Sequence, residues 1–376
     1  MKFGVGIIGA TGYIGTPYRE EIRKTPGEAR IVALCARRRD RLEAAAAEDG
    51  AILATDQWRE VVEHPEVNLV LVLTPDALHY EPAMACAELR KHLLCEKPVG
   101  TTVEQAADIW HAYRDSGLAH FVPYWTRYVP VILRAKQLVD AGRLGEIRVI
   151  IYRWHNPRPI LMPFTWRDDA QLSTAGSLAD VGSHAYDTLR WILGREATRV
   201  LAHTSVVSPS KPNLGPIDLG EAIAWGNVHD ASENEPPPQQ TQPATQQPSV
   251  PDMAQLAIEF PDQTICSIVL SHASYLRKGF SPELELHGTQ ASLSVNRLTG
   301  ELWIAESPEP AKLLETMTSN SLDNRFANYV FPAMQNQIAG NFSFHPDLED
   351  GWKVQRFVAA AVSSASTGGW VDVSEE

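Results

Sequence analysis

Two residues of this 376-residue chain have the types and spacing of a pair that acts on an alcohol. Asp180 and His184 are four positions apart in a segment expected to be helical, so their side chains share one helix face. A histidine titrates near neutral pH and can take a hydroxyl proton, while a carboxylate can accept a hydrogen bond from a second hydroxyl. An ordinary surface ion pair of the i, i+4 kind is the alternative that these two residues alone leave open.

A glycine-rich segment near the N-terminus has the character of a nucleotide-binding turn. Residues 9–15 read Gly-Ala-Thr-Gly-Tyr-Ile-Gly and join the first expected strand to the first expected helix. Small residues let the backbone approach a pyrophosphate, and the helix N-terminus offers free N–H groups. The spacing is not G-x-G-x-x-G, so a plain strand–helix turn is the alternative, but its place in the first βα unit favours a dinucleotide. The expected cofactor contacts are Gly9, Thr11, Gly12, Tyr13 and Ile14.

The end of the second expected strand favours NADP over NAD. Enzymes that use NAD usually place an acid there, where it binds the ribose hydroxyls. Here the strand ends in Ala36, and Arg37, Arg38 and Arg39 follow. A guanidinium pairs bidentately with a phosphate, so Arg37 and Arg38 predict a site for the 2′-phosphate of NADP, with NAD as the second choice. The alternative is a solvated basic turn, and Arg39 can simply face water.

Further motifs resemble the glucose–fructose oxidoreductase / inositol dehydrogenase (Gfo/Idh/MocA) family. The order of Glu96-Lys97-Pro98 before Asp180-x-Gly182-x-His184 is specific, and the resemblance covers nearly the whole chain outside one insertion. The glycine spacing, Arg90 and the run 173–176 depart from the family pattern. The other matching motifs are Thr74-Pro75 with His79, Arg127-Tyr128 with Pro130, 142–147, Trp166-Arg167, Gly288-Thr289 and 349–351.

The resemblance implies roles for these residues. In the family the lysine side chain reaches the substrate, and the peptide before the proline is often cis, so Lys97 is expected to be catalytic with Asp180 and His184. A lysine ammonium at this place would keep the histidine neutral and polarise the substrate oxygen. Further cofactor contacts are expected from Thr74, Pro75, His79, Glu96, Lys97, Trp166 and Arg167. Substrate contacts are expected from Lys97, Tyr124, Arg167, Asp180 and His184.

The elements that position these residues alternate regularly in the first third of the chain. This rhythm predicts βαβ units and a parallel sheet covered on both faces, that is, an α/β Rossmann domain over residues 1–122. Strands are expected at 3–9, 30–36, 67–73, 92–95 and 119–122, and helices at 14–24, 40–48, 79–90 and 102–116.

The rhythm changes after residue 123. Few helices separate the later strands, which predicts an α+β domain over 123–376 with a large, mostly antiparallel open sheet. Residues 233–251 are rich in Pro and Gln without apolar periodicity, so a flexible exposed insertion is expected there. Helices are expected at 130–141, 177–193 and 350–366, and strands at 146–154, 197–206, 254–260, 264–273, 283–287, 291–296 and 370–373.

Composition limits the classes of partner. The net charge of −13 disfavours nucleic acid and anionic membranes, and no stretch is long and apolar enough to span a bilayer. No signal peptide is recognisable at the N-terminus. The four cysteines are scattered, which indicates reduced thiols in a cytoplasmic protein, and no Cys/His cluster has the spacing of a metal site. By the resemblance, the open sheet face packs on a second subunit, which implies a homodimer or homotetramer.

The sequence therefore predicts an NAD(P)-dependent oxidoreductase that prefers NADP. Its substrate would be a secondary alcohol, or the corresponding ketone, of a sugar, cyclitol or related polyol. One alternative is a redox-neutral lyase or glycosidase that retains its nicotinamide cofactor and works through a transient ketone. The other is a nucleotide-dependent sensor without catalysis, against which Lys97, Asp180 and His184 argue because a sensor needs none of them.

Overall fold

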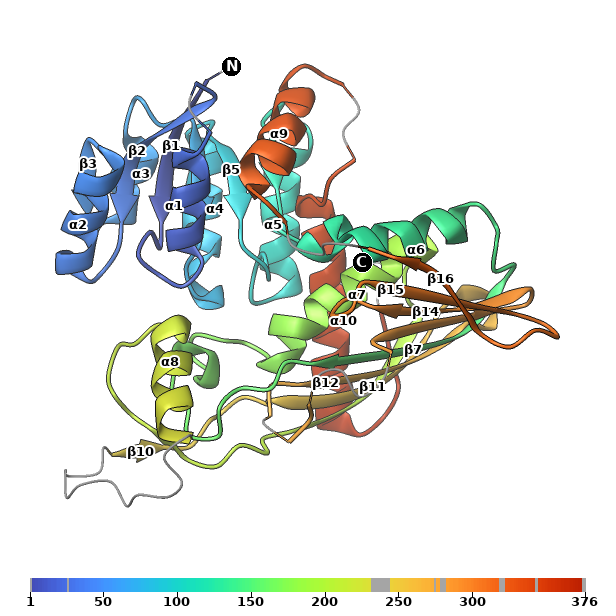
Figure 1. The fold of residues 1–376 in the computed structure, drawn as a ribbon. Coiled ribbons are helices and arrows are strands. Elements are labelled where there is room, and N and C mark those ends of the chain that lie inside the picture. The colour runs from blue at the N-terminus through green and yellow to red at the C-terminus, as the bar shows by residue number, and fades with distance from the viewer. Residues whose placement is uncertain are drawn as a thin grey trace.

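The computed structural model describes residues 2–25, 27–230, 244–273, 275–277, 282–317, 322–341 and 344–373. The chain is built around two sheets, with the blue N-terminal sheet beside the larger one (Figure 1). All four cysteines are buried and have free thiols. Among the described residues, no helix is long and apolar enough to cross a bilayer.

The first sheet has six parallel strands in the order β3-β2-β1-β4-β5-β6. Its strand order reverses between β1 and β4, and in such sheets ligands bind outside the carboxyl ends of the strands at that point. The predicted Rossmann arrangement is confirmed. The strands are β1 (Phe3–Ile8), β2 (Ala29–Cys35), β3 (Leu53–Thr55), β4 (Leu69–Val72), β5 (His92–Cys95) and β6 (His120–Phe121). The helices are α1 (Gly15–Arg23), α2 (Arg39–Asp49), α3 (Trp58–Glu63), α4 (Tyr80–Glu88) and α5 (Val103–Arg114).

A segment from the C-terminal part of the chain packs on this first sheet. Helix α9 (Phe331–Ile338) and the π-helical turn Phe326–Val330 before it share a hydrophobic core with β1. The ring of Phe331 stacks on that of Phe3 with 5.5 Å between centroids. The core of the first sheet therefore includes residues far beyond position 122. The expected domain division between residues 122 and 123 stays a prediction.

The second sheet has nine strands in the order β16-β15-β14-β13-β7-β12-β11-β8-β17. Only the β7–β12 pair is parallel, so the predicted, mostly antiparallel sheet is confirmed. Helices α6 (Pro130–Asp140), α7 (Ser183–Leu193) and α10 (Leu348–Thr367) lie along one face (Figure 1). The strands are β7 (Ile147–His155), β8 (Arg199–Ser205), β11 (Met253–Glu259), β12 (Ile265–Ser271), β13 (Leu284–Gly288), β14 (Ala291–Asn296), β15 (Glu301–Glu306), β16 (Lys312–Thr316) and β17 (Val371–Asp372).

The segment between β8 and β11 contains α8 (Leu219–Asp230) and a two-stranded sheet of β9 (Lys211–Pro212) and β10 (Thr245–Gln246). Of the insertion expected at 233–251, residues 233–243 lie outside the described part of the chain. The prediction of a loose loop is wrong for 244–251. Val250 is buried, and the carbonyl oxygen of Pro251 accepts a hydrogen bond of 2.8 Å from the Ser177 N–H.

Candidate active site

A cavity of about 1770 Å³ runs from the carboxyl ends of β1 and β2 to the start of α7. Small-molecule sites commonly occupy roughly 300–1,000 Å³, so this cavity has room for a dinucleotide and a second small molecule. Most residues expected to bind cofactor or substrate line it. These are Gly9, Thr11, Gly12, Tyr13, Ile14, Arg37, Arg38, Thr74, Pro75, Glu96, Lys97, Trp166, Arg167, Asp180 and His184.

The turn after β1 is shaped for close approach of a ligand. Gly9 has a φ of +91°, and a Cβ there would lie 2.6 Å from the carbonyl oxygen of Leu73. A Cβ on Gly15, where α1 begins, would lie 2.4 Å from the carbonyl oxygen of Gly9. The turn therefore excludes side chains at both positions and presents backbone to the cavity, which suits the pyrophosphate of a dinucleotide.

The three arginines after β2 lie in different surroundings. Arg37 is exposed at the cavity wall and, within the described part of the chain, makes no ion pair. Arg38 donates to both carboxylate oxygens of Glu221, at 3.3 and 3.1 Å. Arg39 faces solvent and pairs with Glu43 at 3.1 Å. The expectation that Arg37 and Arg38 both await a phosphate therefore needs correction, because Arg38 is already engaged by a carboxylate.

His79 holds the loop after β4 in place and does not line the cavity. Its ring is fully buried, with Nδ1 2.7 Å from the carbonyl oxygen of Pro98 and Nε2 2.8 Å from that of Thr74. It therefore ties the Thr74 loop to the Lys97–Pro98 segment, whose peptide bond is cis. His79 is predicted to contact the cofactor, but in the structure it lies outside the cavity and positions this loop. The neighbouring Glu96 accepts a hydrogen bond of 3.2 Å from the Lys97 N–H.

Asp180 is the centre of a charged cluster at the α7 end of the cavity. Lys97 Nζ donates to its Oδ1 at 2.9 Å and to its backbone carbonyl oxygen at 2.8 Å. Arg158 Nη2 and His272 Nε2 each lie 3.1 Å from its Oδ2, and Arg167 Nε lies 3.8 Å from the same oxygen. Burial alone would raise the pKa of this carboxyl, but Lys97 and His272 overcome burial and hold that pKa well below its usual value. Asp180 is therefore a stable anion that orients the Lys97 ammonium.

His184 is held by aromatic rings and is neutral at physiological pH. Trp154 stacks on its ring with centroids 5.8 Å apart, and Tyr124 contacts it edge-on at 5.8 Å. Burial lowers the pKa of His184 well below its usual value, and the charge of Lys97 lowers it further. Its Nδ1 is buried and makes no hydrogen bond within the described part of the chain. Tyr124 is fully buried behind His184, so the predicted substrate contact of Tyr124 is replaced by support of that ring.

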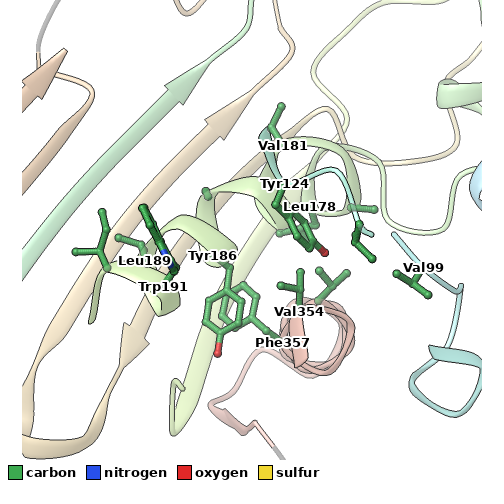
Figure 2. Packing of buried hydrophobic residues seen from close by; sticks show 14 of the residues in the cluster. Val99, Tyr124, Leu178, Val181, Tyr186, Leu189, Trp191, Val354 and Phe357 are labelled. Carbon is green, nitrogen blue, oxygen red and sulfur yellow. The ribbon is translucent and has the colours of Figure 1, made fainter. Parts of the chain in front are cut away.

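Helix α7, which carries His184, is anchored on the face that is turned away from the cavity. Asp180 lies in a π-helical turn, Leu178–Gly182, that runs directly into α7, and such turns are frequent at functional sites. Figure 2 shows Tyr186 of α7 lying over Phe357 of α10, with ring centroids 3.8 Å apart and an interplanar angle of 5°. Asp187 accepts a buried hydrogen bond of 2.8 Å from Arg127 Nε. These contacts fix the face of α7 that is turned away from the cavity.

Arg158 and His272 are site residues that the sequence motifs did not reveal. They follow β7 and β12, which pair in parallel so that His155 lies opposite Ser271. The pairing brings the two strand ends together beside Asp180. Neither residue belongs to a recognisable motif, and only the strand pairing could have indicated that they meet. Among the described residues, no group of three His, Cys, Asp or Glu side chains is placed to hold a metal ion.

Comparison with known proteins agrees with this geometry. A family model described as "Oxidoreductase family, NAD-binding Rossmann fold" matches residues 3–124, and the GFO/IDH/MocA C-terminal domain matches residues 132–294. Levoglucosan dehydrogenase of Pseudarthrobacter phenanthrenivorans is 27% identical over 348 residues, which are 86% of this chain and 84% of that protein. D-glucoside 3-dehydrogenase of Escherichia coli is 26% identical over 374 residues, covering 98% and 97% of the two chains.

Solved structures show the same fold over the whole chain. Levoglucosan dehydrogenase in complex with NADH superposes with a TM-score of 0.81 at 22% identity and covers 100% of both chains. An oxidoreductase domain protein from Kribbella flavida gives a TM-score of 0.82 at 23% identity, again over 100% of both chains.

Proposed function

The chain belongs to the Gfo/Idh/MocA family of NAD(P)-dependent oxidoreductases, and we propose that it oxidises a secondary alcohol of a sugar, cyclitol or related polyol, or reduces the corresponding ketone. The observation that carries this proposal is the neutral His184 beside the Lys97–Asp180 ion pair, in a cavity with the volume for a dinucleotide. The names of the relatives, which include levoglucosan, glucoside and inositol dehydrogenases, support a sugar or cyclitol substrate.

Each residue has a defined part in this chemistry. A bound nicotinamide supplies the group that accepts or gives the hydride. His184 takes the proton of the substrate hydroxyl and, because its pKa is low, is ready to do so at neutral pH. Lys97 donates a hydrogen bond to the substrate oxygen and stabilises the negative charge that develops on it. Asp180 keeps the Lys97 ammonium in place through its Oδ1 contact.

A screen of sugars and cyclitols with NAD and with NADP tests this function. The purified chain should produce reduced nicotinamide, followed by absorbance, with at least one polyol, and His184→Gln should abolish the signal. Nucleotide retained through purification, together with substrate turnover but no net reduction, would instead identify a redox-neutral reaction.

The preference for NADP is proposed from Arg37. This side chain lies at the cavity wall where β2 ends, which is the place of the adenosine ribose in this type of fold. One charge-assisted hydrogen bond contributes about 1.5–3 kcal/mol, which corresponds to roughly tenfold or more in affinity. Arg37→Ser should lower the affinity for NADPH by at least that factor and leave the affinity for NADH nearly unchanged.

A homodimer or homotetramer is proposed from the open face of the nine-stranded sheet. Val149, Ile265 and Trp303 are 36%, 52% and 37% exposed, and Val149 and Ile265 lie opposite each other on neighbouring strands. Leu313, 47% exposed, lies opposite Trp303. Light scattering on the wild type and on Trp303→Glu tests the proposal, since a charge on this face should dissociate subunits that pack there. A monomeric wild type would overturn it.

A further inference from the structure

The adenosine end of the cavity is closed by a helix from the second half of the chain. Asp218, Leu219 and Ile223, at the start of α8, line the cavity, and ion pairs from Arg38 to Asp218 and Glu221 bring this end of α8 next to Arg37. The first turn of α8 lies on Tyr13 of the nucleotide-binding turn, because a Cβ on Gly220 would come within 3.3 Å of the Tyr13 ring. In Figure 1, α8 stands below the blue sheet, on the side where β1 and β2 end. The wall facing the nucleotide ribose therefore includes residues far from the Rossmann motif in sequence.

Two carboxylates at the start of α8 are held rigidly by a capping box. The Asp218 N–H donates to Glu221 Oε2 at 2.9 Å, and the Glu221 N–H donates to Asp218 Oδ1 at 2.9 Å. The same carboxylates reach across to α2. Glu221 accepts from Arg38 at 3.3 and 3.1 Å and also contacts Arg41, while Arg41 Nη1 lies 3.1 Å from Asp218 Oδ2. We call Arg38, Arg41, Asp218 and Glu221 the ion quartet.

The ion quartet changes the electrostatics of the ribose site. Its two positive and two negative charges cancel, which, among the described residues, leaves Arg37 beside the quartet as an arginine without an ion pair. A 2′-phosphate carries about −1.5 to −2 at pH 7, and it would lie beside the quartet carboxylates and compete with them for Arg38. A ribose 2′-hydroxyl is uncharged and can donate a hydrogen bond to a carboxylate. Compared with a wall in which the arginines are free, the two carboxylates therefore weaken the binding of NADP and leave the binding of NAD unaffected.

We propose that Asp218 and Glu221 are nucleotide-specificity residues that lower the preference for NADP created by Arg37. They supply, from the second half of the chain, the acidic group that is absent at Ala36. The inference rests on the proposed function, because it requires a nicotinamide dinucleotide in this cavity. It extends that function by assigning part of the nucleotide choice to a helix outside the Rossmann sheet.

The test is Glu221→Gln in the full chain, measured as the dissociation constants of NADPH and of NADH without substrate. Glutamine at this position keeps the capping box, so α8 stays formed while one negative charge is lost. The ratio of NADPH to NADH affinity should rise about tenfold, the effect of releasing one charged partner for the phosphate. The rise should shrink at high salt, because the quartet side chains are 21–37% exposed.

Glu43→Gln is the matched control. It removes the same charge from α2, at a carboxylate that pairs with Arg39 in solvent and, among the described residues, makes no ion pair with Arg38 or Arg41, so the affinity ratio should stay at the wild-type value. Asp218→Asn keeps the helix cap and should shift the ratio in the same direction as Glu221→Gln, which provides a second test if either variant folds poorly.

The outcomes distinguish failure of this inference from failure of the proposed function. An unchanged ratio in both Glu221→Gln and Asp218→Asn, with both nucleotides still bound, overturns the inference and leaves the proposed function standing. Equal weakening of both nucleotides also overturns it, since α8 would then act only as a clamp. Wild-type protein that binds neither nucleotide overturns the proposed function and the inference together.

Discussion

Replacing Lys97 with methionine removes one positive charge from the cluster around Asp180. Lys97 is 11% exposed, and its ammonium contacts Asp180 through both a carboxylate and a backbone oxygen. Methionine keeps a long apolar side chain in that space. Asp180 retains Arg158 and His272 at 3.1 Å, so the carboxylate does not become an unpaired buried charge. The change is therefore expected to act on catalysis more than on folding.

The size of the effect follows from the place of the ammonium. One preorganised donor to a developing oxyanion is worth about 2.7–4 kcal/mol in a water-excluded site, or roughly 10²–10³-fold in kcat. A second effect concerns pH. Burial lowers the pKa of His184 most, and Lys97 lowers it further, so Lys97→Met should raise that pKa while burial still holds it below its usual value. Because the base must be neutral, the activity of the variant should begin to fall at a higher pH than that of the wild type as the pH is lowered.

The assay is the pH profile of kcat/KM between about pH 5 and 9, together with nucleotide binding measured without substrate. Lys312→Met is the control, since Lys312 is 62% exposed and pairs with Glu306 on the second sheet. Turnover of Lys97→Met within about threefold of wild type would refute the catalytic role. Loss of nucleotide binding with normal folding would show that Lys97 anchors the cofactor instead.

Three further predictions follow from other parts of the chain. His184→Ala should lower turnover by roughly 10²–10⁴-fold with unchanged nucleotide affinity, and near-normal turnover anywhere between about pH 6 and 9 would contradict its role as base. Replacing residues 231–243 with a short Gly/Ser linker should leave melting temperature and turnover nearly unchanged, by reason of composition, and a large loss of either would assign them a contact. Arg127→Met should lower the free energy of unfolding in urea by about 3–5 kcal/mol, because the buried Asp187 would lose both hydrogen bonds from Arg127 and keep Arg190 at 3.9 Å, whereas the exposed Arg39→Met should change it by less than about 0.5 kcal/mol.

The elements that sequence analysis recovered are those whose burial produces a strong local pattern. The apolar runs that became β1, β2 and β4 are buried on both faces and were recognised as strands. Strand β3 has three residues and α3 has six, too few for a period to be detected. Helix α8 contains Gly220 and Gly226, which weaken helix propensity, and it was missed altogether.

The site shows the same division between local and long-range information. The nucleotide turn and the Lys97 motif are continuous in sequence, and their positions could be predicted. The Arg38–Glu221 pair joins residues that are 183 positions apart, and the Arg158–His272 neighbourhood depends on the parallel pairing of β7 and β12. No local pattern specifies such contacts, because they result from the packing of complete elements. For this reason the sequence predicts that Arg38 binds a phosphate, whereas in the structure Glu221 already holds it.

The two ends of the cavity differ in how firmly they are held, and this difference predicts how a nucleotide enters. Nine of the eleven residues of α7 are buried. By contrast, α8 has a small apolar cluster of Met162, Leu219 and Ala222, and its ion pairs with α2 are partly exposed. Exposed ion pairs contribute only about 0–1 kcal/mol each, so α8 should open locally far more often than α7.

Amide hydrogen exchange measures this directly. In the nucleotide-free chain, the amides of α8 should exchange much faster than those of α7, because local opening needs to break only the small cluster and the ion quartet. Saturating NADPH or NADH should slow exchange in α8, since a nucleotide beneath the helix adds contacts that opening would break, while α7 should change little. Equal protection of the two helices without nucleotide would mean that α8 is part of the rigid core, and entry from the α8 side would then be excluded.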